Sequence, residues 1–452
     1  MQVDIQKSLT IQKELADFIV NCRTERIAER LIEDMKYRVI DWLGCAVVGA
    51  HYPQCDIARQ TFTRFGGCAE SSVIGSEERY PAATAAMVNG IIGHVSELDD
   101  GHRKAIGHPG SVTLPVALAL GESLKVSGAE FLSALIVGYD VYIRLGQTVN
   151  PSHYAHWHTT GTCGTFAAAA TAARLMKLTP KQTCSALGIA ATLASGLVAS
   201  FGSHAKALNV GNACQNGIYA AVLAKDGFTG SPQALVGEKG YVKATSSADS
   251  LQYLEQPTEE GLLSDTAFYK VYASCGHTNS PLDAIFNLIK THAPQANKIA
   301  HIKVETYRIS VSLTAALKAG NEDEAKFSLP YCIAVALTFG QVSLAEFQPD
   351  VLNDPDVLAL ASKIEVVESE EATARFPKRQ ARVTVVMEDG TTYLQEVMDA
   401  TDVVDFPMLE QKFLHSAQSV DRQASQEVLA FIKSMDKRGD IAPLVAYLKK
   451  IR

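Results

Sequence analysis

Apolar side chains recur at helical spacing through the first 265 or so residues of the chain. In residues 24–50 they return near every third and fourth position, with charged residues between them, which is the pattern of a helix with one buried face. Alanine-rich stretches follow at residues 82–98, 165–179 and 213–230. Small residues let helices approach closely, so this part of the chain is predicted to be a set of packed helices.

Two residue pairs mark predicted helix starts. Ser127 is followed by Glu130 three residues later, and Thr179-Pro180 places a proline at a first turn; both arrangements are typical of helix N-termini. Residues 186–202 are apolar and rich in alanine, glycine and serine, and we expect one buried helix there. The stretch is short of the roughly 20 apolar residues that a membrane-spanning helix needs.

The pattern changes after about residue 268. Residues 300–311 alternate between apolar and polar side chains, as a half-buried strand does. Residues 381–400 hold two β-rich runs around Asp389-Gly390, which predicts a hairpin. Residues 322–340, which lie between these runs, are expected to form a helix.

The last 50 residues return to a helical pattern, in residues 426–436 and 442–452. A helical tail after an α+β segment indicates that the first domain is discontinuous. We therefore predict a mainly α protein, with a large helical domain from residues 1–267 and 399–452 and a smaller α+β lid domain from residues 268–398.

Composition and charge narrow the class of protein. The chain has 452 residues, of which 47% are hydrophobic and 20% charged, as in a globular protein. The formal net charge is -8, which argues against nucleic acid or a membrane surface as a partner. The nine cysteines include no Cys-x-x-Cys pair and no signal peptide opens the chain, so we expect reduced thiols in a cytoplasmic protein.

Proton-carrying side chains concentrate in one stretch, 94-HVSELDDGHRKAIGHPG-110, and seven of the twelve histidines lie between His94 and His204. Pro109 disfavours a helical conformation at His108, and the following residues 111–124 have a helical pattern. His108 would then face a helix N-terminus, where free N–H groups attract anions. This position suits a histidine that binds a carboxylate or transfers a proton, although His108 could simply cap the loop.

Three acids in the same stretch come at a predicted helix end. Glu97, Asp99 and Asp100 would there oppose the helix dipole, and a locally broken rule often marks a functional site. The alternative is a solvated helix end with Arg103 and Lys104 as partners.

Three further histidines raise the question of a metal. His153, His156 and His158 could supply the three protein ligands of a catalytic zinc site. No carboxylate lies near them, and the threonine-rich run after His158 resembles a helix start. We expect His158 to line a pocket and the other two to be exposed or structural.

Lys206 follows the apolar stretch and precedes an Asn-Val-Gly-Asn run. A lysine between apolar helices is costly unless an anion pairs with it, and Gly211 would leave the backbone open to a ligand. The alternative is a lysine whose ammonium group reaches solvent at a helix end. Taken alone, Lys270 and Tyr331 are weak candidates, because a tyrosine in an apolar run is usually core.

No phosphate-binding loop, dinucleotide fingerprint or nucleophile elbow occurs in a fitting context. The chemistry therefore looks cofactor-free, with histidines and lysines acting on a small anion.

Four segments carry a resemblance to a known family. Residues 94–122, 156–178, 206–230 and 270–284 resemble the MmgE/PrpD family, which includes 2-methylcitrate dehydratase, cis-aconitate decarboxylase and iminodisuccinate epimerase. The motifs come in the family's order and cover essentially the whole chain. The resemblance implies a helical domain with a smaller lid, a homodimer and no metal.

The resemblance also implies the site. His108, His158, Lys206, Lys270 and Tyr331 fall on active-site positions of the family. Glu97 stands where many members have aspartate, Asp100 keeps the acid of an Asp-Asp pair, and Gly101 stands where many members have threonine. The expected catalytic residues are His108, Lys206, Tyr331, Asp100 and His158, and the expected substrate-binding residues are Glu97, Lys270, His102 and Gly101.

Together with the residues, the resemblance implies a cofactor-free lyase of a small di- or tricarboxylate. An epimerase of a related dicarboxylate is the alternative, favoured by Gly101 and by a longer loop from Gly101 to His108. A metal-dependent hydrolase and a non-catalytic binding protein are the remaining classes. Elemental analysis tests the first, and binding without turnover would favour the second.

Overall fold

The computed structural model describes residues 5–255, 257–317, 320–401 and 405–451. They form two compact units: the first comprises the described residues up to 200, 204–269 and those from 405 onward, and the second comprises 201–203 and 270–401. Helices hold 61% of the residues and strands 8%, so the predicted mainly α class is confirmed.

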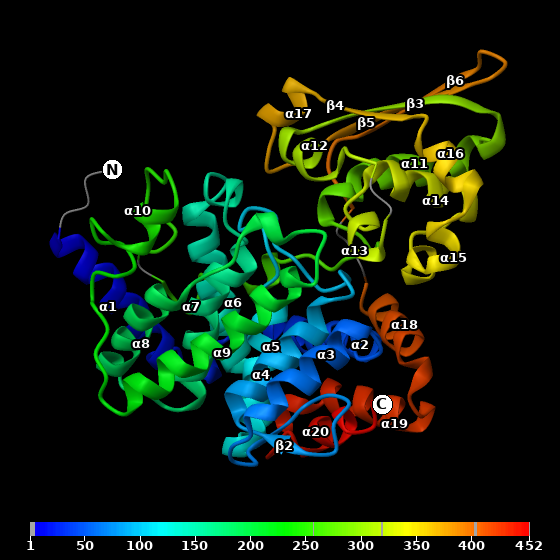
Figure 1. Ribbon diagram of the computed structural model, residues 1–452. Helices are drawn as coiled ribbons and strands as arrows, with labels where there is room; N and C mark the ends of the chain where they lie inside the picture. The colour runs from blue at the N-terminus through cyan, green and yellow to red at the C-terminus, as the bar shows by residue number, and fades with distance from the viewer. Residues whose placement is uncertain (1–4, 256, 318–319, 402–404, 452) are drawn as a thin grey trace. The chain divides into compact units, whose positions relative to one another are not determined.

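The first unit is built around helices that pack through small side chains. At its centre α7 lies against α9, α6 and α5, and α4 packs on α9 (Figure 1). Its helices are α1 (Ile5–Asn21), α2 (Glu29–Gly49), α3 (Pro53–Phe62), α4 (Ala82–His94), α5 (Pro109–Leu124), α6 (Gly128–Val149), α7 (Thr159–Leu175), α8 (Pro180–Leu193), α9 (Ala205–Lys225), α10 (Tyr241–Thr245), α18 (Phe406–Ser416), α19 (Arg422–Lys433) and α20 (Ala442–Leu448).

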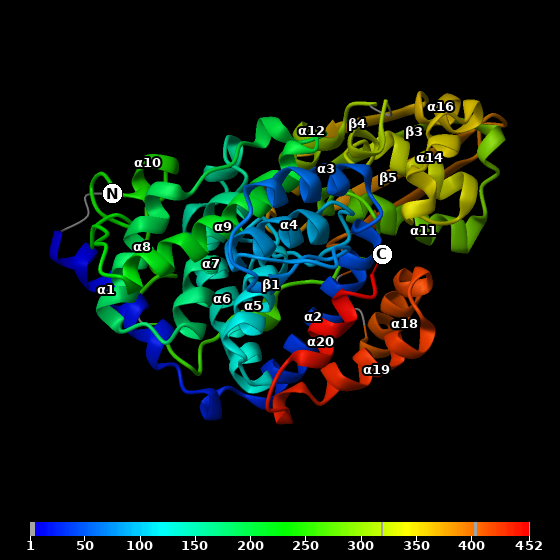
Figure 2. The same ribbon diagram turned by 60° about the horizontal axis from the view of Figure 1, so that its bottom comes forward.

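The helices nearest the C-terminus belong to this first unit. Figure 2 shows α18, α19 and α20 beside α2, and both α18 and α19 contact α2. One feature departs from the expected all-helical domain: the short strands β1 (Ser71–Ser72) and β2 (Arg79–Tyr80) pair as an antiparallel ribbon. Among the described residues, no helix combines the length and the hydropathy that crossing a bilayer requires.

Both predicted capping sites are present. The Ser127 hydroxyl accepts from the Glu130 N–H at 3.2 Å, and Thr179 accepts from Gln182 at 3.3 Å. The single helix expected over residues 186–202 is wrong, because α8 ends at Leu193. Beyond it the backbone pairs with residues 156–158 and so leaves the helical path.

Gly211 has a different role from the expected one. It lies inside α9, where an added Cβ would stand 2.7 Å from the Met87 carbonyl oxygen of α4. Its lack of a side chain therefore lets two helices approach closely, and the expectation of a backbone open to a ligand is wrong.

The second unit contains a four-stranded sheet in the order β4-β3-β5-β6, with β3 parallel to β4 and the other pairs antiparallel. α11 contacts β5 and β6, and α14 contacts α11 (Figure 1). Its elements are α11 (Asn279–His292), β3 (Ile299–Thr306), α12 (Arg308–Thr314), α13 (Glu322–Ala325), α14 (Leu329–Phe339), α15 (Pro349–Leu352), α16 (Pro355–Ala361), β4 (Ile364–Glu368), α17 (Glu370–Ala374), β5 (Ala381–Met387) and β6 (Thr392–Val397).

The predicted hairpin is confirmed as β5 and β6. The strand expected over residues 300–311 is shorter, since the chain enters α12 at Arg308. The helix expected over residues 322–340 is divided into α13 and α14. Ser328 caps the second of these, and Pro330 stands in its first turn.

Candidate active site

The acids of the dense stretch lie in a buried loop that follows α4. The helix ends at His94, and Glu97 adopts a left-handed backbone conformation with φ 58°, which is uncommon for a residue other than glycine. Glu97, Asp99 and Asp100 are all buried. The solvated helix end with Arg103 and Lys104 as partners is therefore wrong.

Asp99 is a hydrogen-bonding centre of this loop. Its Oδ2 accepts from Nδ1 of His94 at 2.8 Å and from the hydroxyl of Ser111, and it lies 3.2 Å from Nδ1 of His108. Burial alone would raise the pKa of Asp99, but the adjacent His108 and His94 hold it well below its ordinary value. Asp99 therefore carries a negative charge at neutral pH.

Lys206 reaches this loop from the first turn of α9. Its Nζ lies 2.7 Å from Nε2 of His94 and also donates to Oε1 of Glu97. The sequence predicted that an anion must pair with this lysine, and one such anion is Glu97 of the chain itself. Both side chains are buried, so each lowers the cost of burying the other.

His94 is a neutral imidazole between two charged groups. Burial, and to a lesser extent the charge of Lys206, lowers the pKa of His94 to about 4. Its Nδ1 faces the Asp99 carboxylate and must donate, which leaves Nε2 as the acceptor for Lys206. His94 opens the dense stretch but was not among the predicted site residues. Its position on an apolar helix could have identified it, because a buried polar ring needs hydrogen-bond partners.

Asp100 is held by residues from distant parts of the sequence. Its Oδ2 accepts from Arg38 at 3.0 Å and from the Tyr139 hydroxyl at 2.9 Å, and its Oδ1 accepts from the Gly110 N–H at 3.1 Å. Burial raises the pKa of Asp100, although the guanidinium of Arg38 opposes this. The carboxylate beside His108 is thus that of Asp99, while Asp100 fastens the loop to α2, α5 and α6.

His108 stands directly before α5, as the sequence predicted. Its Nδ1 lies 2.6 Å from the Asp100 carbonyl oxygen, which can only accept, so Nδ1 carries a proton. Nε2 is then the ring atom that can exchange a proton. The His108 side chain is 16% exposed, whereas those of His94 and Asp99 are 1% exposed, so His108 is the group of this cluster that solvent or a ligand can reach.

His158 precedes α7 in the same way and is buried. Its ring centroid lies 6.0 Å from that of His94, and its Nδ1 lies 3.3 Å from the side-chain amide nitrogen of Asn209. Burial, with the charge of Lys206, holds the pKa of His158 well below its ordinary value. His158 is therefore also neutral at neutral pH.

Gly101 and His102 shape the loop. Gly101 pairs with Phe268 through two backbone hydrogen bonds, and an added Cβ would lie 2.7 Å from Cζ of the Phe268 ring. His102 Nδ1 accepts from the Ala105 N–H at 2.9 Å, and its Nε2 lies 3.1 Å from Thr266 Oγ1. Both ring nitrogens thus hold the loop in shape.

The structure does not gather the three histidines of the metal interpretation. His153 is buried against Thr162 and Thr245, and His156 is exposed. Among the described residues, the group of histidine and acidic side chains close enough to share a metal ion is His94, Asp99 and His108. Their facing nitrogens donate to oxygen, which favours a hydrogen-bonded cluster over metal ligation.

Lys270 and Tyr331 belong to the second unit. Lys270 is buried, and Tyr331 stands in the first turn of α14. The Tyr331 hydroxyl donates to the Glu346 carbonyl oxygen at 2.6 Å, and burial raises the pKa of Tyr331. In this conformation its proton is engaged within the unit.

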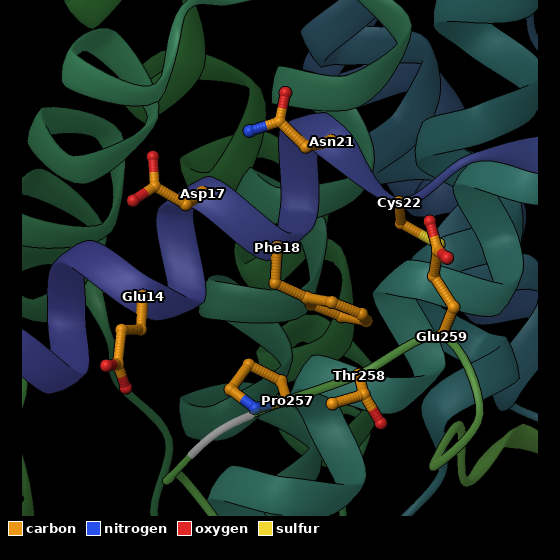
Figure 3. A pocket seen from close by; sticks show the side chains of 8 residues that line it. All are labelled: Glu14, Asp17, Phe18, Asn21, Cys22, Pro257, Thr258 and Glu259. Carbon is orange, nitrogen blue, oxygen red and sulfur yellow. The ribbon is translucent and has the colours of Figure 1, made fainter.

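A separate hollow of about 440 Å³ lies between α1 and residues 257–259 (Figure 3). It is lined by Glu14, Asp17, Phe18, Asn21, Cys22, Pro257, Thr258 and Glu259. Three carboxylates and no basic side chain make it unsuited to an anionic ligand. The cluster of buried histidines and Lys206 remains the candidate active site.

Two family models match this chain over most of its length. The MmgE/PrpD N-terminal domain matches residues 13–254, and the MmgE/PrpD C-terminal domain matches residues 272–437. The chain belongs to the MmgE/PrpD family, as its motifs predicted.

The relatives that the chain resembles are enzymes of two kinds. Cis-aconitate decarboxylase of Aspergillus terreus is 28% identical over 97% of this chain and 96% of its own length, and the Homo sapiens enzyme is 27% identical over 97% and 95%. 2-Methylcitrate dehydratase of Escherichia coli (strain K12) is 22% identical over 86% and 85%. The chain is an enzyme of this dehydratase and decarboxylase class of lyases, as the sequence predicted.

Proposed function

We propose that the protein is a cofactor-free lyase of a small di- or tricarboxylate, with cis-aconitate and 2-methylcitrate as the first candidates. One observation carries the proposal: His108, His158 and Lys206 stand at the N-terminal ends of three helices, α5, α7 and α9, and all three are close to His94. Helix N-termini and a buried ammonium group together favour a bound carboxylate.

His108 is the proposed acid and base, acting through Nε2. In a decarboxylation the carbon–carboxylate electron pair stays on carbon as carbon dioxide leaves, and protonated His108 supplies the proton. In a dehydration neutral His108 removes a proton from carbon, and the electron pair left behind forms the double bond as the carbon–oxygen bond breaks. The protonated His108 then gives the proton to the leaving hydroxyl, which departs as water. Positioned groups of this kind contribute roughly 10²–10⁴-fold to a rate.

Lys206 and His158 are proposed to orient the carboxylates of the substrate. Glu97 accepts a hydrogen bond from Lys206, so a substrate carboxylate would share this lysine with Glu97. The roles expected of Lys270 and Tyr331 in the second unit rest on the resemblance alone. A homodimeric state also follows from the resemblance, and light scattering of the purified protein tests it. A cytoplasmic location is proposed from the cysteine pattern instead.

Decarboxylation is favoured over dehydration by the greater identity to the decarboxylases, at 28% against 22%. Epimerisation is the second candidate, and one observation supports it. Phe268 packs over Gly101, and a glycine at position 101 offers no side-chain donor to a leaving hydroxyl group. An epimerase does not need such a donor, because no hydroxyl group leaves.

Proton NMR in D2O of the purified, chelator-treated enzyme tests the proposal. The substrates are 2-methylcitrate, citrate, cis-aconitate and iminodisuccinate, and the matched control is His108→Gln. A new alkene or itaconate signal, absent with His108→Gln, establishes the lyase. Deuterium incorporation without elimination establishes the epimerase, whereas turnover that survives His108→Gln contradicts the role of His108.

A further inference from the structure

A continuous chain of contacts joins two of the proposed site residues, Lys206 and His108. From Lys206 Nζ it runs 2.7 Å to His94 Nε2, then 2.8 Å from His94 Nδ1 to Asp99 Oδ2, and then 3.2 Å to His108 Nδ1. His94 and Asp99, the two middle members, are 0% and 1% exposed. The sequence marked Asp99 only as one of three acids at a candidate site and did not mark His94. In the structure His94 contacts Lys206 and Asp99 contacts His108.

The hydrogen-bond partners of His94 and His108 determine which ring nitrogen of each carries a proton. Asp99 is ionised and can only accept, so the proton of His94 is on Nδ1. Lys206 donates to Nε2 of the same ring. His108 keeps a proton on Nδ1 because the Asp100 carbonyl oxygen accepts it. The Ser111 hydroxyl gives Asp99 Oδ2 a further donor, so the carboxylate cannot rotate without losing contacts.

We propose that Asp99 and His94 are positioning residues that link the acid–base group to the substrate-binding lysine. Asp99 stabilises the positive charge that His108 gains when Nε2 takes a proton from the substrate carbon, whose electron pair stays on that carbon. Through His94, Asp99 also fixes Nε2 as the acceptor that holds Lys206. The kinetic part of this inference rests on the proposed function, whereas the proton positions do not.

Several other charged groups lie near His94, Asp99 and His108. Titratable and charged groups that act on its two histidines and on Asp99 are Glu97, Asp100, His158, Lys206, Asp41 and Lys412. Asp41 pairs with Lys412 at 2.7 Å, and Asp100 pairs with Arg38. Of the carboxylates in this region that the structure describes, Asp99 is the one in direct contact with both His94 and His108.

Nitrogen-15 NMR of the histidine rings, without any substrate, tests the proton positions. In the unmodified protein His94, assigned through His94→Gln, is expected to remain neutral with its proton on Nδ1 from pH 8 to pH 5. In Asp99→Asn the proton is expected to move to Nε2 in part of the molecules, because the charged acceptor is lost. A proton on Nε2 of His94 in the unmodified protein overturns the inference even if the variant does not fold.

Kinetics of Asp99→Asn test the coupling to His108. We expect kcat to fall on the order of 10²-fold, and the midpoint of the pH dependence of kcat/KM to move down, since the variant removes a carboxylate that favours positive charge on the acid–base group. Asp140→Asn is the matched control: Asp140 is a buried carboxylate paired with Arg144 at 2.5 Å, and its loss should leave the midpoint in place.

The outcomes separate the two proposals. An unmoved midpoint with an unchanged His94 ring overturns the positioning role while leaving the lyase intact. No turnover by the unmodified enzyme, combined with the expected ring spectra, overturns the proposed function and leaves the proton positions standing. A merely structural role for Asp99 would lower stability in both aspartate variants and shift the pH midpoint in neither.

Discussion

Lys206 donates a hydrogen bond to His94, with Nζ 2.7 Å from Nε2 of the ring. An ammonium group and an imidazole attract each other in this way only while the imidazole is neutral. The low pKa of His94, about 4 because of its burial, maintains that condition at neutral pH. The buried lysine thus depends on a histidine that stays uncharged.

Replacing Lys206 should cost stability as well as activity. Lys206→Met leaves the buried Glu97 carboxylate without its cation, and breaking one side of a buried pair typically costs about 3–5 kcal/mol. Urea denaturation measures this loss. The double variant Lys206→Met/Glu97→Gln should recover much of the stability but none of the substrate affinity. Equal stabilities for the single variant and the unmodified protein would show that Glu97 has another adequate partner.

His108→Ala should lower turnover strongly while the fold stays intact. His108 lies in a loop and its side chain is not fully buried, so its loss should not unfold the protein, whereas kcat should fall roughly 10²–10⁴-fold. Circular dichroism and steady-state kinetics measure the two effects. His102→Gln provides the comparison, because both nitrogens of His102 hold the loop and its replacement should lower stability. Near-normal turnover of His108→Ala would exclude it as the acid–base group.

Stability should decrease as the pH falls from 6.5 toward 4. Burial lowers the pKa of both His94 and His153 to about 4, so in this range the unfolded chain binds protons that the folded protein does not. Each histidine contributes a slope of about 1.4 kcal/mol per pH unit. Asp140, whose pKa burial raises to about 6, opposes the trend. The free energy of unfolding in urea, measured at several pH values, should show the fall, and His153→Gln should flatten it.

Gly101→Thr should destabilise the loop. The new Cβ would lie 2.7 Å from the Phe268 ring, which is closer than carbon atoms approach, so either the ring or the loop must move. Thermal unfolding should show a lower Tm for the single variant and a partial recovery in Gly101→Thr/Phe268→Ala. If Gly101→Thr alone unfolds at the normal temperature, Phe268 moves easily and does not restrict this position.

Much of the helical architecture could be predicted from the sequence because it depends on local signals. The caps at Ser127 and Thr179 are complete within three residues, and the hairpin at residues 381–397 is signalled by its turn. The end of α8 at Leu193 could not be predicted, because it depends on backbone pairing with residues 156–158, which are distant in the sequence.

In the candidate site, too, the features set by local sequence could be predicted and those set by distant contacts could not. The sequence located the dense loop, but not which acid of the Asp99-Asp100 pair faces His108. That choice depends on the left-handed turn at Glu97 and on Arg38, 62 residues earlier in the chain, which takes the carboxylate of Asp100. A side chain's direction after a non-helical turn is not encoded in residue spacing.

The discontinuity of the first unit has a consequence for synthesis. Asp41 on α2 is buried with Lys412 of α18 as its cation, and the same lysine also donates to the Leu98 carbonyl oxygen, next to Asp99. While the ribosome is still translating the second unit, the nascent helical unit lacks this lysine. Residues of the last tenth of the chain must therefore emerge before the loop that holds Asp99 receives its final support, and a prematurely terminated chain would carry every proposed acid–base residue without that support.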